Sequence, residues 1–356
     1  MPSKKTLIVV SLIVLGVMVL GLATFLLSDV GKLVNVFQHL HATEMIFALV
    51  CTGVAYLAFT LSFNALFEMT PYRIPFPKFF SIMFISATVN FIISSGGMSS
   101  IAIRAFLLKH EKVPYSVTIP LSFAQNMIFN LVLSCVCFGG LIYLHGHPEF
   151  VGGAKAMVVF SFMGGLLLVV GLMLMIFFNS AFRRWFLKLV INIGNWINRF
   201  ILRRKTKLKR LVQIRKQLEE TIAFLHRGWL HLLIVLFWVC MDWSFTALTL
   251  YFCFRAAGVV LPLGLLMVGF TVMFLSSNIN PVPAGLGVSE SLLAVTFKLL
   301  GVNFEQTLVA AILFRFVFFF LPIAVSTALY LDTMRSFLKA HDAEEKKKHA
   351  LASHKH

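Results

Sequence analysis

The sequence has few charged residues, and only a minority of these are acidic. Asp, Glu, Lys and Arg together make up 13% of the 356 residues, and 14 acidic residues stand against 31 basic ones. Hydrophobic residues make up 59% of the chain, and the mean hydropathy is +0.89. This balance excludes an ordinary soluble globular protein and predicts an all-α polytopic membrane protein.

Motifs for enzyme chemistry and for metal binding are also lacking. The five cysteines lie within or at the edge of apolar runs, without the spacing of a disulfide framework or a zinc site. The chain contains no G-x-x-x-x-G-K-[ST] nucleotide loop, no H-E-x-x-H motif and no G-x-S-x-G motif. We therefore predict no catalytic residues, no metal and no cofactor, and we expect that the chain is not an enzyme.

Long apolar runs are abundant, and six of them reach the length of about 20 residues that a helix needs to cross a bilayer. The first run lacks the short apolar core and the cleavage site of a signal peptide, so we predict a retained span. The six predicted spans are residues 7–27, 45–67, 117–144, 156–178, 229–254 and 308–331. Within the run 117–144, Asn126 and Asn130 are one helical turn apart and are predicted to make interhelical hydrogen bonds.

Two further apolar segments are interrupted by small and polar residues. In the first, arms 79–93 and 101–108 flank a break that contains Gly96, Gly97 and Ser99. In the second, arms 261–275 and 292–300 flank a break at 278–290, which contains Asn280, Pro283, Gly285, Gly287, Ser289 and Glu290. Each arm is too short to span a bilayer, so each segment is predicted to form a re-entrant hairpin of two half-helices. For the second segment, the alternative is a Pro-kinked structural helix with Glu290 at the interface.

Lys and Arg are concentrated in residues 181–227, where only Glu219 and Glu220 oppose them. Aromatic and aliphatic residues, including Trp185 and Trp196, recur there at helical spacing. We predict a basic amphipathic cytoplasmic segment that lies on the anionic lipids of the inner leaflet. A solvated charged linker is the alternative, and a nucleic-acid partner is not expected.

The basic segment also constrains the predicted topology. The positive-inside rule places residues 181–227 in the cytoplasm only if the segment 79–108 enters and leaves the membrane on the cytoplasmic side. About six segments then cross fully, both termini are cytoplasmic, and the two hairpins point at each other from opposite faces as an inverted repeat. In this prediction residues 1–335 form a single transmembrane domain, and the charged residues 336–356 form a disordered cytoplasmic tail.

Four ionisable residues are predicted to lie at membrane depth: Arg104, Asp242, Glu290 and Arg315. The planar donors of arginine suit a phosphate group, so Arg104 and Arg315 are candidate ligands of an anionic lipid headgroup. Glu290 is expected either to pair with Arg315 or to accept a cationic headgroup. Proton coupling through Asp242 or Glu290 is a further hypothesis, and a structural role is the alternative for Asp242.

Residues 280–290 resemble the P-x-P-G-G-x-G-x-x-E signature of the lysylphosphatidylglycerol synthase transmembrane family, also called the flippase-like family. Arg315 resembles the arginine of that family's last span, and residues 94–108 with Arg104 resemble an earlier Gly-rich motif. Ala284 stands where the family usually has Gly, and Met98 and Ser99 replace a position that is commonly acidic. The resemblance covers about residues 7–335 and implies a lipid-translocating membrane domain. The soluble aminoacyl-transferase domain of larger members is absent from the resemblance, so lipid lysylation is not implied.

Together these observations predict a lipid flippase-like transporter of the bacterial inner membrane, which moves a phospholipid or a polyprenyl-linked lipid. A membrane enzyme or enzyme subunit acting on a polyprenyl-phosphate lipid and a small-solute carrier are the alternatives. The oligomeric state is left open, with a homodimer as one option. The predicted substrate-binding residues are Gly96, Gly97, Ser99, Arg104, Asn280, Pro283, Gly285, Gly287, Ser289, Glu290 and Arg315.

Overall fold

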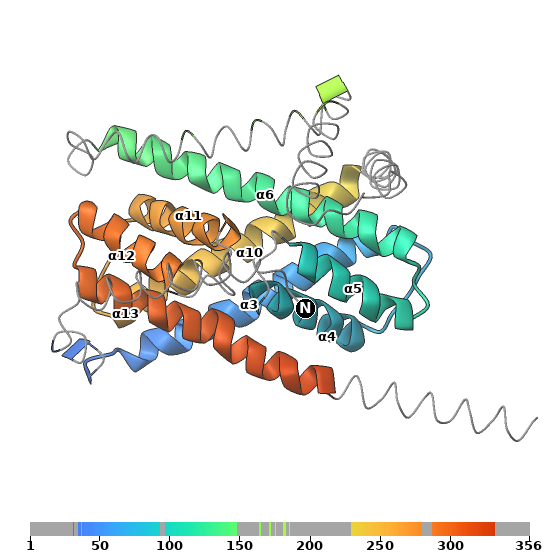
Figure 1. Cartoon of the computed structure of the whole chain (residues 1–356), viewed down its shortest axis with the longest axis horizontal. Coiled ribbons are helices and arrows are strands. Elements are labelled where there is room, and N and C mark those ends of the chain that lie inside the picture. The colour runs from blue at the N-terminus through green and yellow to red at the C-terminus, as the bar shows by residue number, and fades with distance from the viewer. Residues whose placement is uncertain are drawn as a thin grey trace, which may run out of the picture.

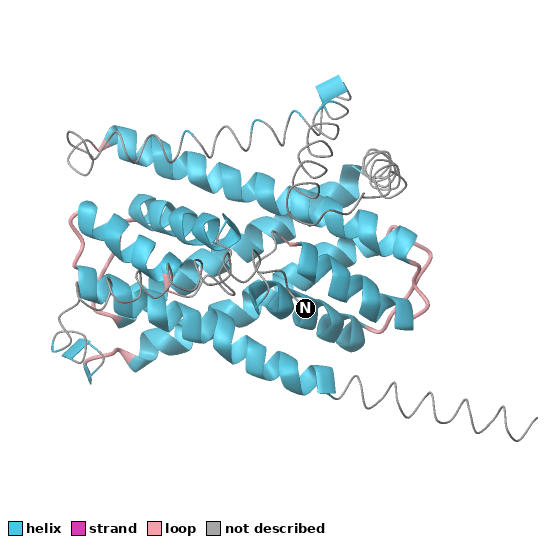
Figure 2. Cartoon of the chain, viewed as in Figure 1, coloured by secondary structure: helices cyan, strands magenta, loops and turns pink. Residues whose placement is uncertain are grey.

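The computed structural model describes residues 38–92, 97–147, 229–279 and 287–331, together with residues 31, 35, 36, 164, 171, 175, 181, 182 and 185. Every regular element in these ranges is helical, as Figure 2 shows. The predicted first span and the charged tail lie outside the described residues. So do the break at 280–286 and, apart from the isolated residues, the span 156–178 and the basic segment 181–227.

Four of the described helices are long and apolar enough to cross a membrane. They are α3 (Ala42–Phe67), α6 (Tyr115–Gly146), α10 (Trp229–Ala256) and the last helix, which spans Phe304–Leu331. The last helix consists of α13 (Phe304–Arg315), a π-helical segment (Phe316–Phe320) and residues 321–331. These helices match four of the six predicted spans and confirm an all-helical, multi-pass membrane protein.

The remaining described helices are short and come in two pairs. In the first pair α4 (Phe76–Ile92, 17 residues) packs against α5 (Met98–His110, 13 residues). In the second pair α11 (Leu263–Ile279, 17 residues) packs against α12 (Val288–Leu299, 12 residues). Figure 1 shows the two pairs at opposite ends of the molecule. All four helices are shorter than the roughly 20 residues of a full span, as the sequence predicts for both interrupted segments.

Both breaks are narrower than the sequence predicts. Helix α5 already begins at Met98, α11 continues through Ile279, and α12 begins at Val288. Gly97 and Gly287 act as N-caps with φ of 92° and 79°, a backbone conformation that glycine adopts without steric cost. The polar residues that follow each glycine therefore belong to the first turn of a helix.

The buried apolar side chains form two main clusters that share the long helices. The α5 cluster contains residues of α3, α4, α5, α6 and α10, such as Phe63, Phe79 and Leu107. The α12 cluster contains residues of α10, the second pair and the last helix, such as Phe254, Phe297 and Phe314. Helices α3 and α10 pack against each other and contribute to both clusters. This pairing therefore joins the two ends of the molecule.

Large apolar side chains also cover the outside of the long helices. Ile46, Phe47 and Val50 on α3 and Leu230, Leu233 and Phe237 on α10 are each about half exposed or more. An exposed apolar surface of this kind is costly in water and is favourable against lipid tails. The exposure of these side chains therefore agrees with the membrane class.

Helices α11 and α12 approach each other closely at Gly269. A Cβ atom at this position would lie 2.0 Å from Phe297 Cε2, so Gly269→Ala must displace the ring or part the helices. We expect this overpacking to lower the free energy of unfolding by about 1–3 kcal/mol, measured by denaturant titration in detergent. The control is Gly53→Ala on α3, where no atom in the described part of the chain lies within 4 Å of the Cβ position. That control should be neutral or stabilising by up to about 1 kcal/mol, and equal losses for the two variants would contradict the close approach.

Candidate functional site

Arg315, Glu290 and Ser289 form a buried cluster between the last helix and the second short pair. Arg315 Nε lies 2.5 Å from Glu290 Oε1, and the two side chains are only 3% and 9% exposed. Another nitrogen of the guanidinium donates to the Ser289 hydroxyl, which in turn donates to Glu290 Oε2 at 3.3 Å. The three side chains are thus linked in a closed set of polar contacts.

The position of this cluster follows from local structure on both sides. Gly287 is the N-cap of α12, so Ser289 and Glu290 lie in the first turn of this helix, where the helix dipole favours a negative charge. Arg315 is the last residue of α13, immediately before the π-helical segment. Its guanidinium also lies 4.4 Å from the centroid of the Phe319 ring, a cation–π contact within the same helix.

The predicted contact between Glu290 and Arg315 is present in the structure. A buried charge is very costly by itself, and pairing with an opposite charge offsets part of this cost. Neither residue faces water, so each depends on the other for its electrostatic stabilisation. The same contacts leave two chemical options open to a lipid headgroup. Its phosphate can take the place of Glu290 on the guanidinium, or its amine can take the place of Arg315 on the carboxylate.

Arg104 has a different environment. It is 2% exposed, and its guanidinium donates to Gln125 Oε1 at 2.7 Å and to the hydroxyls of Ser122 and Ser100 at 3.3 and 3.4 Å. It also lies 4.2 Å from the centroid of the Phe63 ring in the α5 cluster. Within the described parts of the chain, no carboxylate forms an ion pair with it. The structure therefore places Arg104 and Arg315 in separate packing environments, each at one of the short pairs.

Gln125 is a site residue that the sequence analysis did not single out. Its carboxamide oxygen accepts from Arg104, and its nitrogen donates to the Phe59 carbonyl at 3.1 Å and to Ser62 Oγ at 2.7 Å. It therefore connects α5, α6 and α3 around the buried cation. The available signal was a long amide side chain within the apolar run 117–144, where polar groups need buried partners.

Gly97 and Ser99, at the tip of the first pair, lie among amide side chains. Ser99 Oγ donates to Asn90 Oδ1 at 3.1 Å, and the Asn126 carboxamide packs directly against Gly97. Asn130 Nδ2 donates to the Asn126 carbonyl of its own helix at 2.7 Å. This bond lies within α6, because a carbonyl one turn away is within reach, and the predicted interhelical bond of Asn130 stays a prediction.

Gly97→Ala and Gly287→Ala are expected to differ in cost. Both need a positive φ, which costs an alanine about 1–2 kcal/mol. At Gly97 the new Cβ would also lie 2.9 Å from Asn126 Oδ1, whereas at Gly287 no atom of the described residues lies within 4 Å of the Cβ position. Gly97→Ala should therefore lower the free energy of unfolding more, and Asn126→Ala should remove the difference. A larger loss for Gly287→Ala in the same denaturation assay would contradict this geometry.

Asp242 is buried at 8% exposure on α10, which packs against α3. The Thr246 hydroxyl donates to the Asp242 backbone carbonyl at 2.7 Å, and Asp242 interacts electrostatically with Tyr56 on α3. The residue is thus at a helix interface, apart from the contacts of the Arg315 cluster. Proton coupling through Asp242 stays a prediction. The other predicted site residues, Gly96, Asn280, Pro283 and Gly285, lie outside the described residues.

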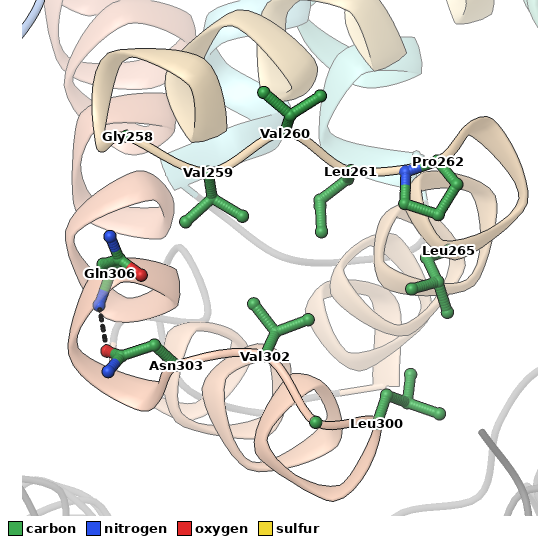
Figure 3. Close-up of a pocket in the computed structure, with 11 residues that line it drawn as sticks. Gly258, Val259, Val260, Leu261, Pro262, Leu265, Leu300, Val302, Asn303 and Gln306 are labelled. Atoms are coloured by element: carbon green, nitrogen blue, oxygen red, sulfur yellow. Dashed lines mark hydrogen bonds between the residues drawn. The ribbon is translucent and has the colours of Figure 1, made fainter. Parts of the chain in front are cut away.

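A pocket of about 400 Å³ lies at the outer end of the second pair (Figure 3). The loop between α10 and α11 and the turn between α12 and α13 line it, and Val259, Leu261 and Val302 supply apolar side chains. On its polar side the Gln306 backbone N–H donates to Asn303 Oδ1 at 3.1 Å, which caps α13. None of the predicted site residues that the structure describes lines this pocket. In the parts of the chain that the structure describes, no group of His, Cys, Asp and Glu is arranged to hold a metal ion.

Comparison with known proteins gives one family match and several curated relatives. The family model described as the lysylphosphatidylglycerol synthase TM region matches residues 8–326. A Staphylococcus aureus (strain MRSA252) phosphatidylglycerol lysyltransferase is 28% identical over 118 residues, which are 29% of this chain and 14% of the relative. The enzyme of the same name from Staphylococcus epidermidis is 25% identical over 114 residues, with the same two shares. The alignments thus span about a seventh of the length of these relatives.

Proposed function

This chain belongs to the lysylphosphatidylglycerol synthase TM family, and we propose that it is a lipid flippase-like transporter that carries a phospholipid headgroup across the membrane. The observation that carries the proposal is the buried cluster of Arg315, Glu290 and Ser289 at the first turn of a short, membrane-depth helix. Ionisable groups in such a place are costly and are retained for function.

The chemistry of the cluster suits a headgroup that carries a phosphate. The guanidinium offers several donors in a plane, and the dipole at the N-terminus of α12 adds positive potential. Glu290 offers a partner for an amine, such as that of an aminoacylated headgroup. Because the curated relatives are named for phosphatidylglycerol, this lipid and its lysyl ester are the first substrates to test.

We propose the predicted topology together with this function. Each half has the same order of elements: a long helix, a helix of 17 residues, a glycine with positive φ, a helix of 12–13 residues and another long helix. The two short pairs occupy opposite ends of the molecule in Figure 1. Both features support two re-entrant hairpins in an inverted repeat. About six full spans and two cytoplasmic termini in a bacterium complete the proposed topology, on the basis of the apolar runs and the basic segment of the sequence.

We also propose that membrane lipids are the partners of this chain and that it catalyses no reaction of its own. The match to a transmembrane region over residues 8–326 supports the first statement. The basic residues of 181–227 would bind the anionic inner leaflet. Lipid tails would remain in the bilayer while the headgroup passes the tips of the two pairs.

Lipid movement in proteoliposomes tests the proposal. The purified protein is reconstituted with headgroup-labelled phosphatidylglycerol, lysyl-phosphatidylglycerol or phosphatidylethanolamine, and label in the outer leaflet is bleached by a membrane-impermeant reductant. We expect bleaching beyond the outer-leaflet fraction for at least one lipid, relative to protein-free vesicles. Turnover of the headgroup would favour a membrane enzyme instead, and solute flux without lipid movement would favour a carrier. If the folded protein moves no lipid, the proposal is wrong.

A further inference from the structure

The last helix changes its hydrogen-bonding pattern directly after Arg315. In the segment Phe316–Phe320 the helix is of the π type, and the Leu321 N–H bonds to the Phe316 carbonyl five residues back. Short π segments inside α-helices are rare and occur frequently at functional sites. A single extra residue in a helix turns all following side chains by about 100°. The segment therefore decides which way Arg315 points relative to the rest of the helix.

The last helix contacts the second short pair before this segment and the first short pair after it. Before it, Arg315 contacts Glu290 and Ser289 on α12 of the second pair. After it, Ser326 accepts a hydrogen bond from Thr88 on α4 of the first pair, at 2.6 Å. The π-helical segment is thus the joint between the contacts to the two pairs.

Tyr56 on α3 is bonded to this joint. Its hydroxyl donates to the Phe318 carbonyl at 3.1 Å, and the side chain is buried at 4% exposure. Proline has no N–H, so Pro322 cannot donate to the Phe318 carbonyl four residues back as an α-helical residue would. The Tyr56 hydroxyl therefore donates to the Phe318 carbonyl, for which Pro322 cannot supply the α-helical N–H donor.

The ring of Tyr56 extends the connection to the first pair. Its centroid lies 4.6 Å from that of Phe84 on α4 and 5.6 Å from that of Phe318. Phe318 in turn stacks on Phe314 at 5.1 Å, one residue before Arg315. Because protein interiors are closely packed, a shift of the backbone at Phe318 would be passed to the neighbouring guanidinium.

We propose that Tyr56 is a positioning residue for the Arg315 cluster. Its hydroxyl holds the π-helical segment in the one register that directs Arg315 to Glu290 and Ser289. Because its ring packs between Phe84 on α4 and Phe318, this register depends on the position of α4. The first short pair can therefore influence the ion pair between Arg315 and Glu290 at the second short pair. The role in transport rests on the proposed function, whereas the effect on the ion pair does not.

Tyr56→Phe tests the inference, because it removes the hydroxyl and keeps the ring. The first readout is the infrared band of the Glu290 carboxylate, assigned by the difference between the native protein and Glu290→Gln. We expect this band to shift in Tyr56→Phe, since the guanidinium moves. The second readout is the initial rate of lipid movement, expected to fall about tenfold, the equivalent of one buried hydrogen bond.

Two comparisons separate positioning from a general structural role. Tyr115→Phe removes a hydroxyl from a 41% exposed tyrosine at the start of α6, and it should change neither readout. If Tyr56 acts through Arg315, Tyr56→Phe combined with Arg315→Lys should be no slower than the slower single variant. An unshifted Glu290 band in Tyr56→Phe, or additive effects in the double variant, would overturn the inference. If the native protein moves no lipid, the proposed function fails, and the carboxylate band still decides the role of Tyr56.

Discussion

Glu290→Gln is expected to reduce lipid movement to the rate of protein-free vesicles. Glutamine preserves the shape of the side chain but removes the charge that balances Arg315, whose side chain is 3% exposed. Removing one partner of a buried ion pair leaves the other charge uncompensated, so the free energy of unfolding should also fall by about 3–5 kcal/mol. Both quantities can be measured on the same purified protein, by bleaching of labelled lipid and by denaturant titration.

Glu111→Gln is the matched control for this variant. Glu111 pairs with Lys78 at 2.7 Å, but the Lys78 side chain is 46% exposed. An ion pair near the surface contributes only about 0–1 kcal/mol, so this variant should remain stable and active. Normal lipid movement by a folded Glu290→Gln protein would show that the charge of Glu290 has no part in transport. In that case the ion pair would be structural.

Arg315→Met and Arg104→Met are expected to differ strongly in stability although the chemical change is identical. Arg315→Met leaves the carboxylate of Glu290 buried without its cation, at a cost of about 3–5 kcal/mol. Arg104 is bonded to neutral groups, so Arg104→Met removes a buried charge together with its hydrogen bonds. The desolvation cost of an ion, several kcal/mol, then offsets part of the cost of losing three hydrogen bonds of about 1.5–3 kcal/mol each and a cation–π contact of about 2 kcal/mol.

The unfolding free energy of Arg104→Met should therefore fall less than that of Arg315→Met, because no uncompensated charge remains in the interior. Lipid movement should nevertheless be lost, because a headgroup phosphate would no longer find the guanidinium. Equal destabilisation of the two variants would mean that Arg104 has an anionic partner in the folded protein. Full lipid movement by Arg104→Met would remove Arg104 from the predicted substrate site.

The class of the protein and its long helices follow from the sequence alone. The length of an apolar run limits what can cross a bilayer, and this quantity is local in the chain. For the same reason the two short pairs were recognisable, since both arms of each segment fall below the required length. The exact ends of the two breaks could not be predicted from the sequence, because the backbone conformations of Gly97 and Gly287 decide where α5 and α12 start.

Part of the candidate site was also recognisable, because charged residues within apolar runs are costly and stand out. Arg104, Glu290 and Arg315 stood out in this way, and the observed contact between the last two was one of two options that the sequence offered for Glu290. Gln125 and Tyr56 were missed as partners of the charged residues. Each is an uncharged side chain within an apolar run, and the sequence does not indicate which residue of another helix it contacts.

The sequence by itself determined that the protein belongs in a membrane, how many long apolar runs it has and which charged residues lie within apolar runs. Only the tertiary structure decided which of these charges meet. It separates Arg104 from Arg315, gives the first only neutral partners among the described residues and gives the second a carboxylate. The physical reason is that these helices are apolar on nearly every side, so no periodicity marks the face that packs. The partners of a buried charge are chosen by packing between helices that are far apart in the chain.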